Sequence, residues 1–212
     1  WISEFMTFTL RPSSLYGYEM VIKCQIKPFL GNRPLSALTT NEIQKFYNNV
    51  KKNGRVHPDK QHGTEISDSM VRKTHLLLHE ALDMAVKQRL LVSNPTNGTT
   101  IPKNNYKDKQ ILNDKQLDRF MEIIKTDERW YDFFYTEITT GLRKGEICGL
   151  KWNDFDEHSG KLKIQRSVGR IKDGVLPVGE TKTETGTREI LLPPSTVELL
   201  KKRKENAVSD WI

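Results

Sequence analysis

Residues 139–152 read Thr-Thr-Gly-Leu-Arg-Lys-Gly-Glu-Ile-Cys-Gly-Leu-Lys-Trp, and this stretch is the most informative one for the fold. Gly141 permits a sharp turn, after which a short helix from Arg143 to Leu150 is predicted. The free N–H groups at a helix start attract anions, and a guanidinium in the first turn adds a planar fork suited to phosphate. Glu146 lies on the same helical face as Arg143 and can hold that guanidinium. On spacing alone, an ordinary amphipathic helix with an Arg–Glu pair is the better interpretation.

The residues around this stretch predict a mixed α+β unit over residues 111–212. Helical patterns precede it, and short β-type segments with turn signals such as Ser159-Gly160 follow it. We expect helices at 114–126 and 129–140, strands at Lys161–Arg166, Arg170–Val178 and Thr187–Leu192, and a final helix that starts within Pro193-Pro194-Ser195. This order of helices, small antiparallel sheet and helix is typical of an α+β domain.

Residues 1–98 predict an all-α domain. Apolar residues recur three and four apart between Ser13 and Phe29, and Thr39 to Glu42 has the pattern of a capped helix start. The longest helix is expected to begin at Ser67 and to end near Leu91. Its buried stripe is predicted as Met70, Thr74, Leu77, Ala81 and Ala85, and the opposite, solvent- or DNA-facing surface as Arg72, Lys73, His75, His79, Lys87 and Arg89.

The positive charge is unevenly divided along the chain. Residues 1–110 hold 16 Lys+Arg against 9 Asp+Glu, whereas residues 111–212 hold 18 of each, so the whole net charge of +7 lies in the first half. Such a bias suits a clamp on the phosphate backbone of DNA, although many soluble domains and other anionic partners fit it as well. Residues 99–110 contain Lys103 and Lys107 and predict a linker, which is either a solvated loop or a basic segment lying along DNA.

Several classes of protein do not fit the sequence. Apolar runs are too short to span a bilayer, the N-terminus lacks the layout of a signal peptide, and the G-x-x-x-x-G-K-[ST] phosphate loop is absent. Cys24 and Cys148 lie far apart, and the helical pattern around Cys148 predicts a buried thiol rather than a disulfide or a metal ligand. His75 and His79 have the spacing of a zinc pair but no accompanying motif. We expect a cytoplasmic protein without membrane contact.

Two motifs, in order, resemble the tyrosine recombinase (phage integrase) family. The first is the opening stretch, which is similar to T-G-L-R-x-G-E-x-x-x-L-x-W, and the second is residues 181–193 (TKTETGTREILLP), similar to T-K-T-x-x-S-x-R-x-I-x-L. Gly186 stands where the second motif often has Ser. Phe29-Leu30-Gly31 and Leu38-Thr39 resemble the core-binding domain of the family. The resemblance covers essentially all 212 residues and is nearest to integrases of Gram-positive conjugative transposons.

The resemblance implies a role for each matching residue. Arg143 would grip the non-bridging oxygens of a scissile phosphate, Glu146 would support it, and Lys182 would act as general acid toward the leaving 5′-oxygen. On spacing alone Lys182 is a solvated hairpin lysine. Residues expected to contact DNA are Arg72, Lys73, Lys103, Lys107 and Arg188, with a solvated helix face as an equal alternative for Arg72 and Lys73. Neither a metal nor another cofactor is implied.

The resemblance also implies parts that this sequence does not hold. None of the five histidines has Arg three residues later, and no tyrosine follows Tyr135, so the His-x-x-Arg motif and the nucleophilic Tyr are absent. We therefore expect a helical core-binding domain, a linker and the first portion of a catalytic domain whose C-terminal part is missing. The intact protein would recombine double-stranded DNA as a tetramer. The alternatives are a non-catalytic DNA-binding regulator of the same fold and, less favoured for lack of clustered carboxylates, a metal-dependent nuclease.

Overall fold

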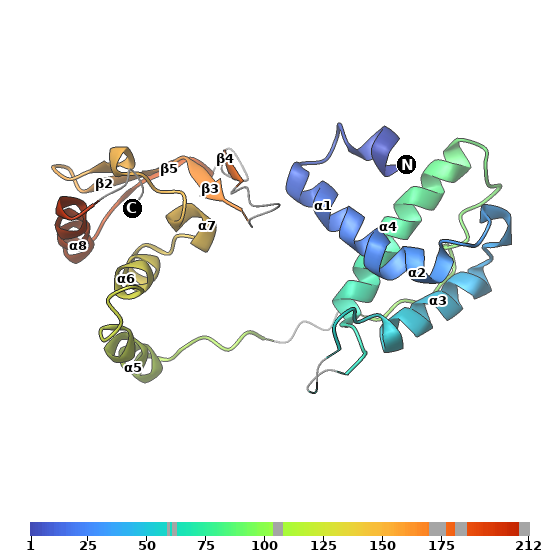
Figure 1. The fold of residues 1–212 in the computed structure, drawn as a ribbon, viewed down its shortest axis with the longest axis horizontal. Helices are drawn as coiled ribbons and strands as arrows, with labels where there is room; N and C mark the ends of the chain where they lie inside the picture. Colours follow the sequence, from blue (N-terminus) through green and yellow to red (C-terminus); the bar gives the residue numbers. More distant parts are fainter. Residues whose placement is uncertain (59, 61–62, 104–107, 170–176, 181–185, 208–212) are drawn as a thin grey trace. The chain divides into compact units, whose positions relative to one another are not determined.

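The computed structural model describes residues 1–58, 60, 63–103, 108–169, 177–180 and 186–207. The chain divides into two compact units, residues 1–108 and 109–212, drawn in Figure 1. No helix among the described residues is long and apolar enough to cross a membrane.

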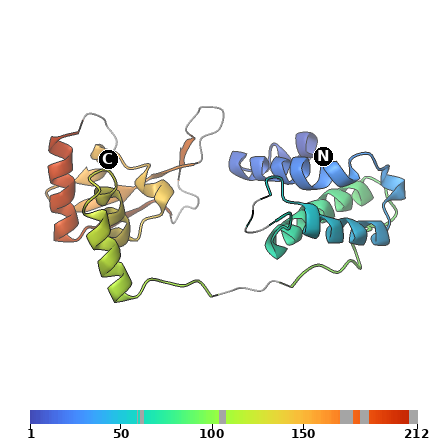
Figure 2. The ribbon, with the colours of Figure 1, turned by 60° about the horizontal axis from the view of Figure 1, so that its bottom comes forward.

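The first unit is built from helices (Figures 1 and 2). Pro28 has no N–H and interrupts α-helical bonding, and the wider π-type turns of η2 precede it. The elements are η1 (Ile2–Met6), α1 (Pro12–Val21), η2 (Ile22–Ile26), α2 (Lys27–Leu30), η3 (Leu35–Ala37), α3 (Thr40–Asn53) and α4 (Asp68–Lys87).

The core of the first unit lies between α3 and α4. The Thr39 hydroxyl accepts a hydrogen bond from the Glu42 N–H, which confirms the predicted helix start. The Ser67 hydroxyl caps α4 in the same way through Met70 N–H. The predicted face of α4 is partly wrong, because the buried residues are Val71, Thr74, Leu77, Leu78, Leu82 and Ala85. The helix also ends at Lys87, earlier than expected, where Arg89 takes a left-handed conformation (φ 60°).

The second unit combines helices with two small antiparallel sheets. Its helical elements are α5 (Asp114–Ile124), α6 (Tyr131–Thr140), α7 (Lys144–Ile147), η4 (Trp152–Asp154) and α8 (Pro194–Glu205). Its strands are β1 (Phe155–Asp156), β2 (Lys161–Ile164), β3 (Arg166–Val168), β4 (Val178–Glu180) and β5 (Arg188–Leu191). One sheet has the order β1-β2-β5 and the other is the β3-β4 pair.

The core of this unit joins the larger sheet to α7 and α8. Leu162 of β2 lies opposite Ile190 of β5, and Leu162 is fully buried. The other buried residues are Leu142, Ile147, Leu150, Phe155, Ile164, Leu192 and Leu200. The Thr196 hydroxyl of α8 donates to the Thr139 hydroxyl of α6 at 2.9 Å, which joins these two helices.

The structure corrects three details of the second unit and describes only the end of a fourth. The predicted strand Lys161–Arg166 is interrupted at Gln165, so that β2 and β3 belong to different sheets. Of the predicted strand 170–178, residues 170–176 lie outside the described ones, and β4 begins at Val178. The short strand β1 was not expected. Cys148 is exposed rather than buried. The helix that was predicted to run to Leu150 ends at Ile147, so Cys148 lies after the helix and not on its apolar face.

Candidate functional site

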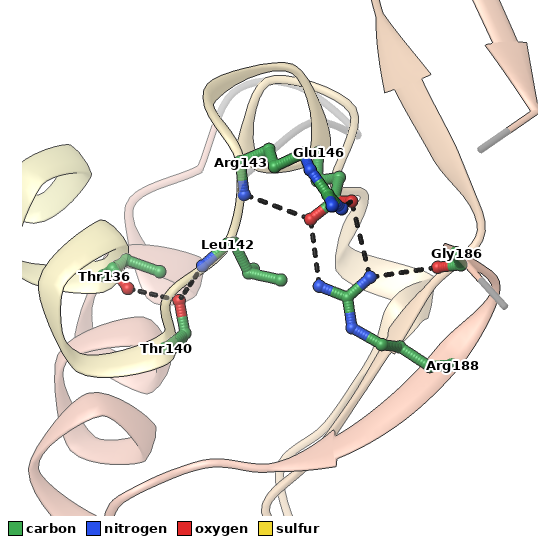
Figure 3. A network of polar contacts seen from close by, with 7 residues as sticks. All are labelled: Thr136, Thr140, Leu142, Arg143, Glu146, Gly186 and Arg188. Atoms are coloured by element: carbon green, nitrogen blue, oxygen red, sulfur yellow. Dashed lines mark hydrogen bonds and ion pairs between the residues drawn. The ribbon is translucent and has the colours of Figure 1, made fainter. Parts of the chain in front are cut away.

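Arg143 lies directly after the turn that leads from α6 into α7 (Figure 3). Helix α6 ends at Thr140, and Gly141 continues in the left-handed region at φ 64°, which favours glycine. Leu142 is 3% exposed and anchors the turn in the core. Arg143 is therefore the N-cap of α7 rather than a residue of its first turn, and its side chain is 79% exposed.

Glu146 is the buried centre of the site. Its side chain is 4% exposed, and its carboxylate accepts the Arg143 backbone N–H at 3.0 Å and Arg143 Nη1 at 2.9 Å. The sequence suggested that the N–H groups at this helix start are free to bind an anion. In the structure the Arg143 N–H donates to Glu146 instead, so it is not free. The side chain of Arg143 remains the exposed cationic group here.

A second arginine reaches Glu146 from β5. Arg188 donates from Nη2 to Glu146 Oε2 at 3.0 Å and from Nη1 to Oε1 at 3.4 Å. Arg188 Nη1 also donates to the Gly186 carbonyl oxygen at 3.1 Å. The pairing of Arg188 with Ile164 across β2 and β5 sets where this side chain begins. One carboxylate therefore joins the two motifs, through residues that are 42 positions apart in the sequence.

The two arginines keep Glu146 ionised. Burial by itself would raise the pKa of Glu146, but hydrogen bonds from Arg188 and from the backbone and side chain of Arg143 outweigh it and lower the pKa to about 2. The site therefore holds two guanidinium groups on one carboxylate and carries a net positive charge. An exposed, oriented guanidinium of this kind can bind a phosphate oxygen.

The other residues predicted for the site lie elsewhere or outside the described part of the chain. Lys182 and Lys107 fall outside the described residues. Lys103 is exposed in the first unit, and Lys73 is exposed on α4 close to Gly17. Arg72 donates from Nη1 to the Pro102 carbonyl oxygen at 2.9 Å, so it holds the chain rather than facing solvent alone. Among the described residues, no group of three or more His, Cys, Asp or Glu is arranged to hold a metal ion.

Residues 94–102, here called the docked segment, lie on α3 and α4. The Thr100 N–H donates to Gln44 Oε1 at 2.7 Å, and Gln44 Nε2 donates to the Thr100 carbonyl oxygen at 3.1 Å. Ile101 packs against the core of the first unit. The first part of the predicted linker is therefore attached to the helical unit.

The docked segment also corrects the prediction for His75 and His79, which are half-buried. His79 Nδ1 lies 2.6 Å from the Thr96 hydroxyl, and His75 Nδ1 lies 3.0 Å from the Tyr47 hydroxyl. Burial lowers the pKa of His75, and the neighbouring His79 and Arg72 lower it further. The expected solvent-facing surface is partly covered at these two residues, because Tyr47 of α3 packs against His75 and Thr96 of the docked segment lies against His79.

Sequence comparisons find relatives of this chain among recombinases and integrases. Residues 1–50 match the family model "Phage integrase, N-terminal SAM-like domain". A tyrosine recombinase XerC-like protein of Caldanaerobacter subterraneus is 24% identical over 96% of this chain and 53% of its own length. The ICEBs1 integrase of Bacillus subtilis is 23% identical over 92% of this chain and 50% of its own length. The chain thus spans about half the length of these curated relatives.

Solved structures show the same fold. The integrase of transposon Tn1549 in complex with a circular intermediate DNA superposes with a TM-score of 0.79 at 18% identity, over 95% of this chain and 62% of that one. A lambda integrase tetramer bound to a Holliday junction gives a TM-score of 0.69 at 20% identity, over 99% of this chain and 56% of that one. These matches confirm the family resemblance and the predicted combination of a helical domain with a mixed α+β domain.

Proposed function

We propose that this chain, which has the fold of the tyrosine recombinases and resembles that family over nearly all its residues, binds duplex DNA and activates one phosphate for strand cleavage. The observation that carries the proposal is the cluster of Arg143, Glu146 and Arg188, in which one buried carboxylate holds an exposed guanidinium. The DNA-bound integrases of the same fold support duplex DNA as the partner.

The chemistry follows from how charge develops on a phosphodiester under attack. The equatorial oxygens gain negative charge, and a guanidinium already held in place stabilises that charge more in the transition state than in the ground state. Glu146 cannot contact the phosphate favourably, since it is anionic and buried, so its role is to orient Arg143. In the whole protein we assign the attack to a tyrosine, with Lys182 donating a proton to the 5′-oxygen that leaves.

The wider roles of the whole protein are part of the same proposal. It would integrate and excise a mobile element in the cytoplasm, with self-association on DNA of the kind reported for lambda integrase. Arg72, Lys73, Lys103 and Lys107 would add contacts to the phosphate backbone. A regulator without catalysis is not favoured, because the relatives matched over most of this chain are a recombinase and an integrase.

The test joins DNA binding to adduct formation. The logarithm of the association constant of this chain for duplex DNA should fall linearly with the logarithm of the salt concentration, with a slope of about −0.9 for each phosphate contact. Full-length protein on a nicked suicide substrate should form a covalent DNA adduct, and Arg143→Ala should slow it about a hundredfold or more. The control Arg203→Ala, at an exposed arginine on α8, should leave the rate unchanged. Tight, salt-dependent binding with no adduct from the wild type would favour the regulator instead.

A further inference from the structure

A second buried carboxylate lies in the same unit, outside the Arg143 cluster. The side chain of Asp154 is 2% exposed, and Arg166 donates to both of its oxygens at 2.8 Å, from Nη1 and Nη2. Asp154 also accepts Gln165 Nε2 at 2.9 Å and the Lys151 backbone N–H at 2.8 Å. Four donors thus satisfy one carboxylate, and the pair is a planar, two-bond contact.

Arg166 begins β3, the strand against which α7 lies. An ideal Cβ on Gly145 would come within 2.5 Å of the Ser167 hydroxyl and 2.8 Å of the Val168 carbonyl oxygen. One on Gly149 would come within 3.0 Å of the Arg166 carbonyl oxygen. α7 and the turn after it therefore lie close against β3 at two glycines, where any side chain larger than hydrogen would meet Ser167, Val168 or Arg166.

Helix α7 depends on these neighbours for its place. It has four residues, far too few to be stable alone, so what holds it is contact with the rest of the unit. Glu146 joins α7 to β5 from one direction, and β3 supports it from another. The Asp154–Arg166 pair ties β3 to η4, and Arg166 Nη1 also donates to the Gly149 carbonyl oxygen, in the turn after α7, at 3.4 Å.

We propose that Asp154 and Arg166 are positioning residues, which hold β3 against α7 and thereby set the place of the Arg143 guanidinium for the phosphate. The proposal rests on the proposed function. A buried ion pair adds little net stability over an apolar pair of similar size, because desolvation of the two charges offsets their attraction. The pair fixes one geometry of β3 relative to α7. This matters for the reaction, because a displacement of about 1 Å in a reacting group can lower the rate about a hundredfold.

The informative variant is Asp154→Leu/Arg166→Met, which removes both charges and leaves none unpaired. Because the variant also removes the acceptor of the Lys151 N–H and of Gln165 Nε2, we expect its thermal unfolding midpoint to fall by a few degrees without loss of the fold, and its affinity for duplex DNA to change less than about twofold. Adduct formation by the full-length protein should slow about tenfold to a hundredfold. The matched control is Asp132→Leu/Arg203→Met, which removes the 2.7 Å pair between α6 and α8 and should leave the rate unchanged.

A change of substrate separates positioning of Arg143 from a general loss of structure. A methylphosphonate duplex carries a methyl group in place of one non-bridging oxygen, so it lacks the negative charge that Arg143 would neutralise. Both Arg143→Ala and the Asp154/Arg166 double variant should therefore lose less on methylphosphonate than on phosphate. An unchanged rate in the double variant, or an equal loss on both substrates, would overturn the proposal.

One further measurement and two milder variants also test the positioning role. Hydrogen exchange at the Ile147 and Cys148 amides, which donate to the Arg143 and Lys144 carbonyl oxygens, should be about tenfold faster in the double variant. Unchanged exchange there would contradict the positioning role even if the wild type forms no adduct, an outcome that refutes only the proposed function. If the double variant does not fold, the single variants Asp154→Asn and Arg166→Lys take its place. Each should slow adduct formation on the phosphate substrate about three- to tenfold and lose less on methylphosphonate.

Discussion

Replacement of Glu146 by Gln should destabilise the second unit in a way that depends on pH. The pKa of Glu146 is lowered from 4.5 to about 2, which at 1.36 kcal/mol per unit corresponds to roughly 3 kcal/mol. Arg143, one of the two partners of Glu146, is 79% exposed, so solvent screens its part of the interaction. We therefore expect Glu146→Gln to lower the free energy of unfolding by about 2 kcal/mol at pH 7. The folded-state pKa lies below the unfolded one, so this stability is fully present above pH 4.5 and is lost as the pH falls toward 2.

The measurement is urea unfolding followed by tryptophan fluorescence in a Trp1→Phe background. The other three tryptophans follow residue 109, so the signal reports the second unit. Glu146→Gln should lower the free energy of unfolding at pH 7 and approach the wild type as the pH nears 2. The control Glu189→Gln changes an exposed carboxylate on the same strand as Arg188 and should stay within about 0.5 kcal/mol. A gap between wild type and Glu146→Gln that is the same at pH 3 and pH 7 would refute the reasoning.

Three further outcomes are expected. Arg188→Ala should cost about 2 kcal/mol of unfolding free energy in the same assay, because it leaves a buried carboxylate short of donors, whereas exposed Arg143→Ala should cost under about 0.5 kcal/mol; equal losses would argue against the burial difference. Gly145→Ala should cost about 1–3 kcal/mol by crowding the backbone of β3, and Gly179→Ala, with no atom within 4 Å of an ideal Cβ, should cost less than half of that. Gln44→Ala should make trypsin cleave after Lys103 faster, since two hydrogen bonds of the docked segment are lost, and an unchanged cleavage rate would show that these bonds do not hold it.

Local signals in the sequence predicted the helix starts well. Thr39, Ser67 and Asn113 each precede a helix and accept the expected backbone N–H, because a cap depends only on residues three positions apart. The buried face of α3 follows from its apolar period in the same way. For α4 the period was ambiguous, since apolar residues occupy more than one face, and packing against α3 selected Val71, Leu78 and Leu82.

Contacts between distant residues could not be predicted from periodicity. The spacing of Arg143 and Glu146 suggested their pair, but that spacing contains no sign of Arg188, which is 42 residues from Glu146. The only signal for it was the arginine in the second motif, whose role was assigned to DNA rather than to Glu146. Asp154 and Arg166 were missed as a site because a pair twelve residues apart has no helical or strand period. The half-burial of His79 likewise depends on Thr96 and Asn94, which fold back onto α4 from later in the chain.

The docked segment has a consequence for how the two units act together. Its last bond, from Arg72 to Pro102, leaves eleven peptide links before the cap of α5 at Asn113. Such a stretch spans at most about 40 Å, whatever its conformation. If one unit binds a duplex, as proposed, a tether of that order would present the other unit at an effective concentration in the millimolar range. Two weak contacts with the phosphate backbone would then give a high overall affinity for DNA. That affinity would depend on the length of the tether, and so on the residue at which the docked segment ends.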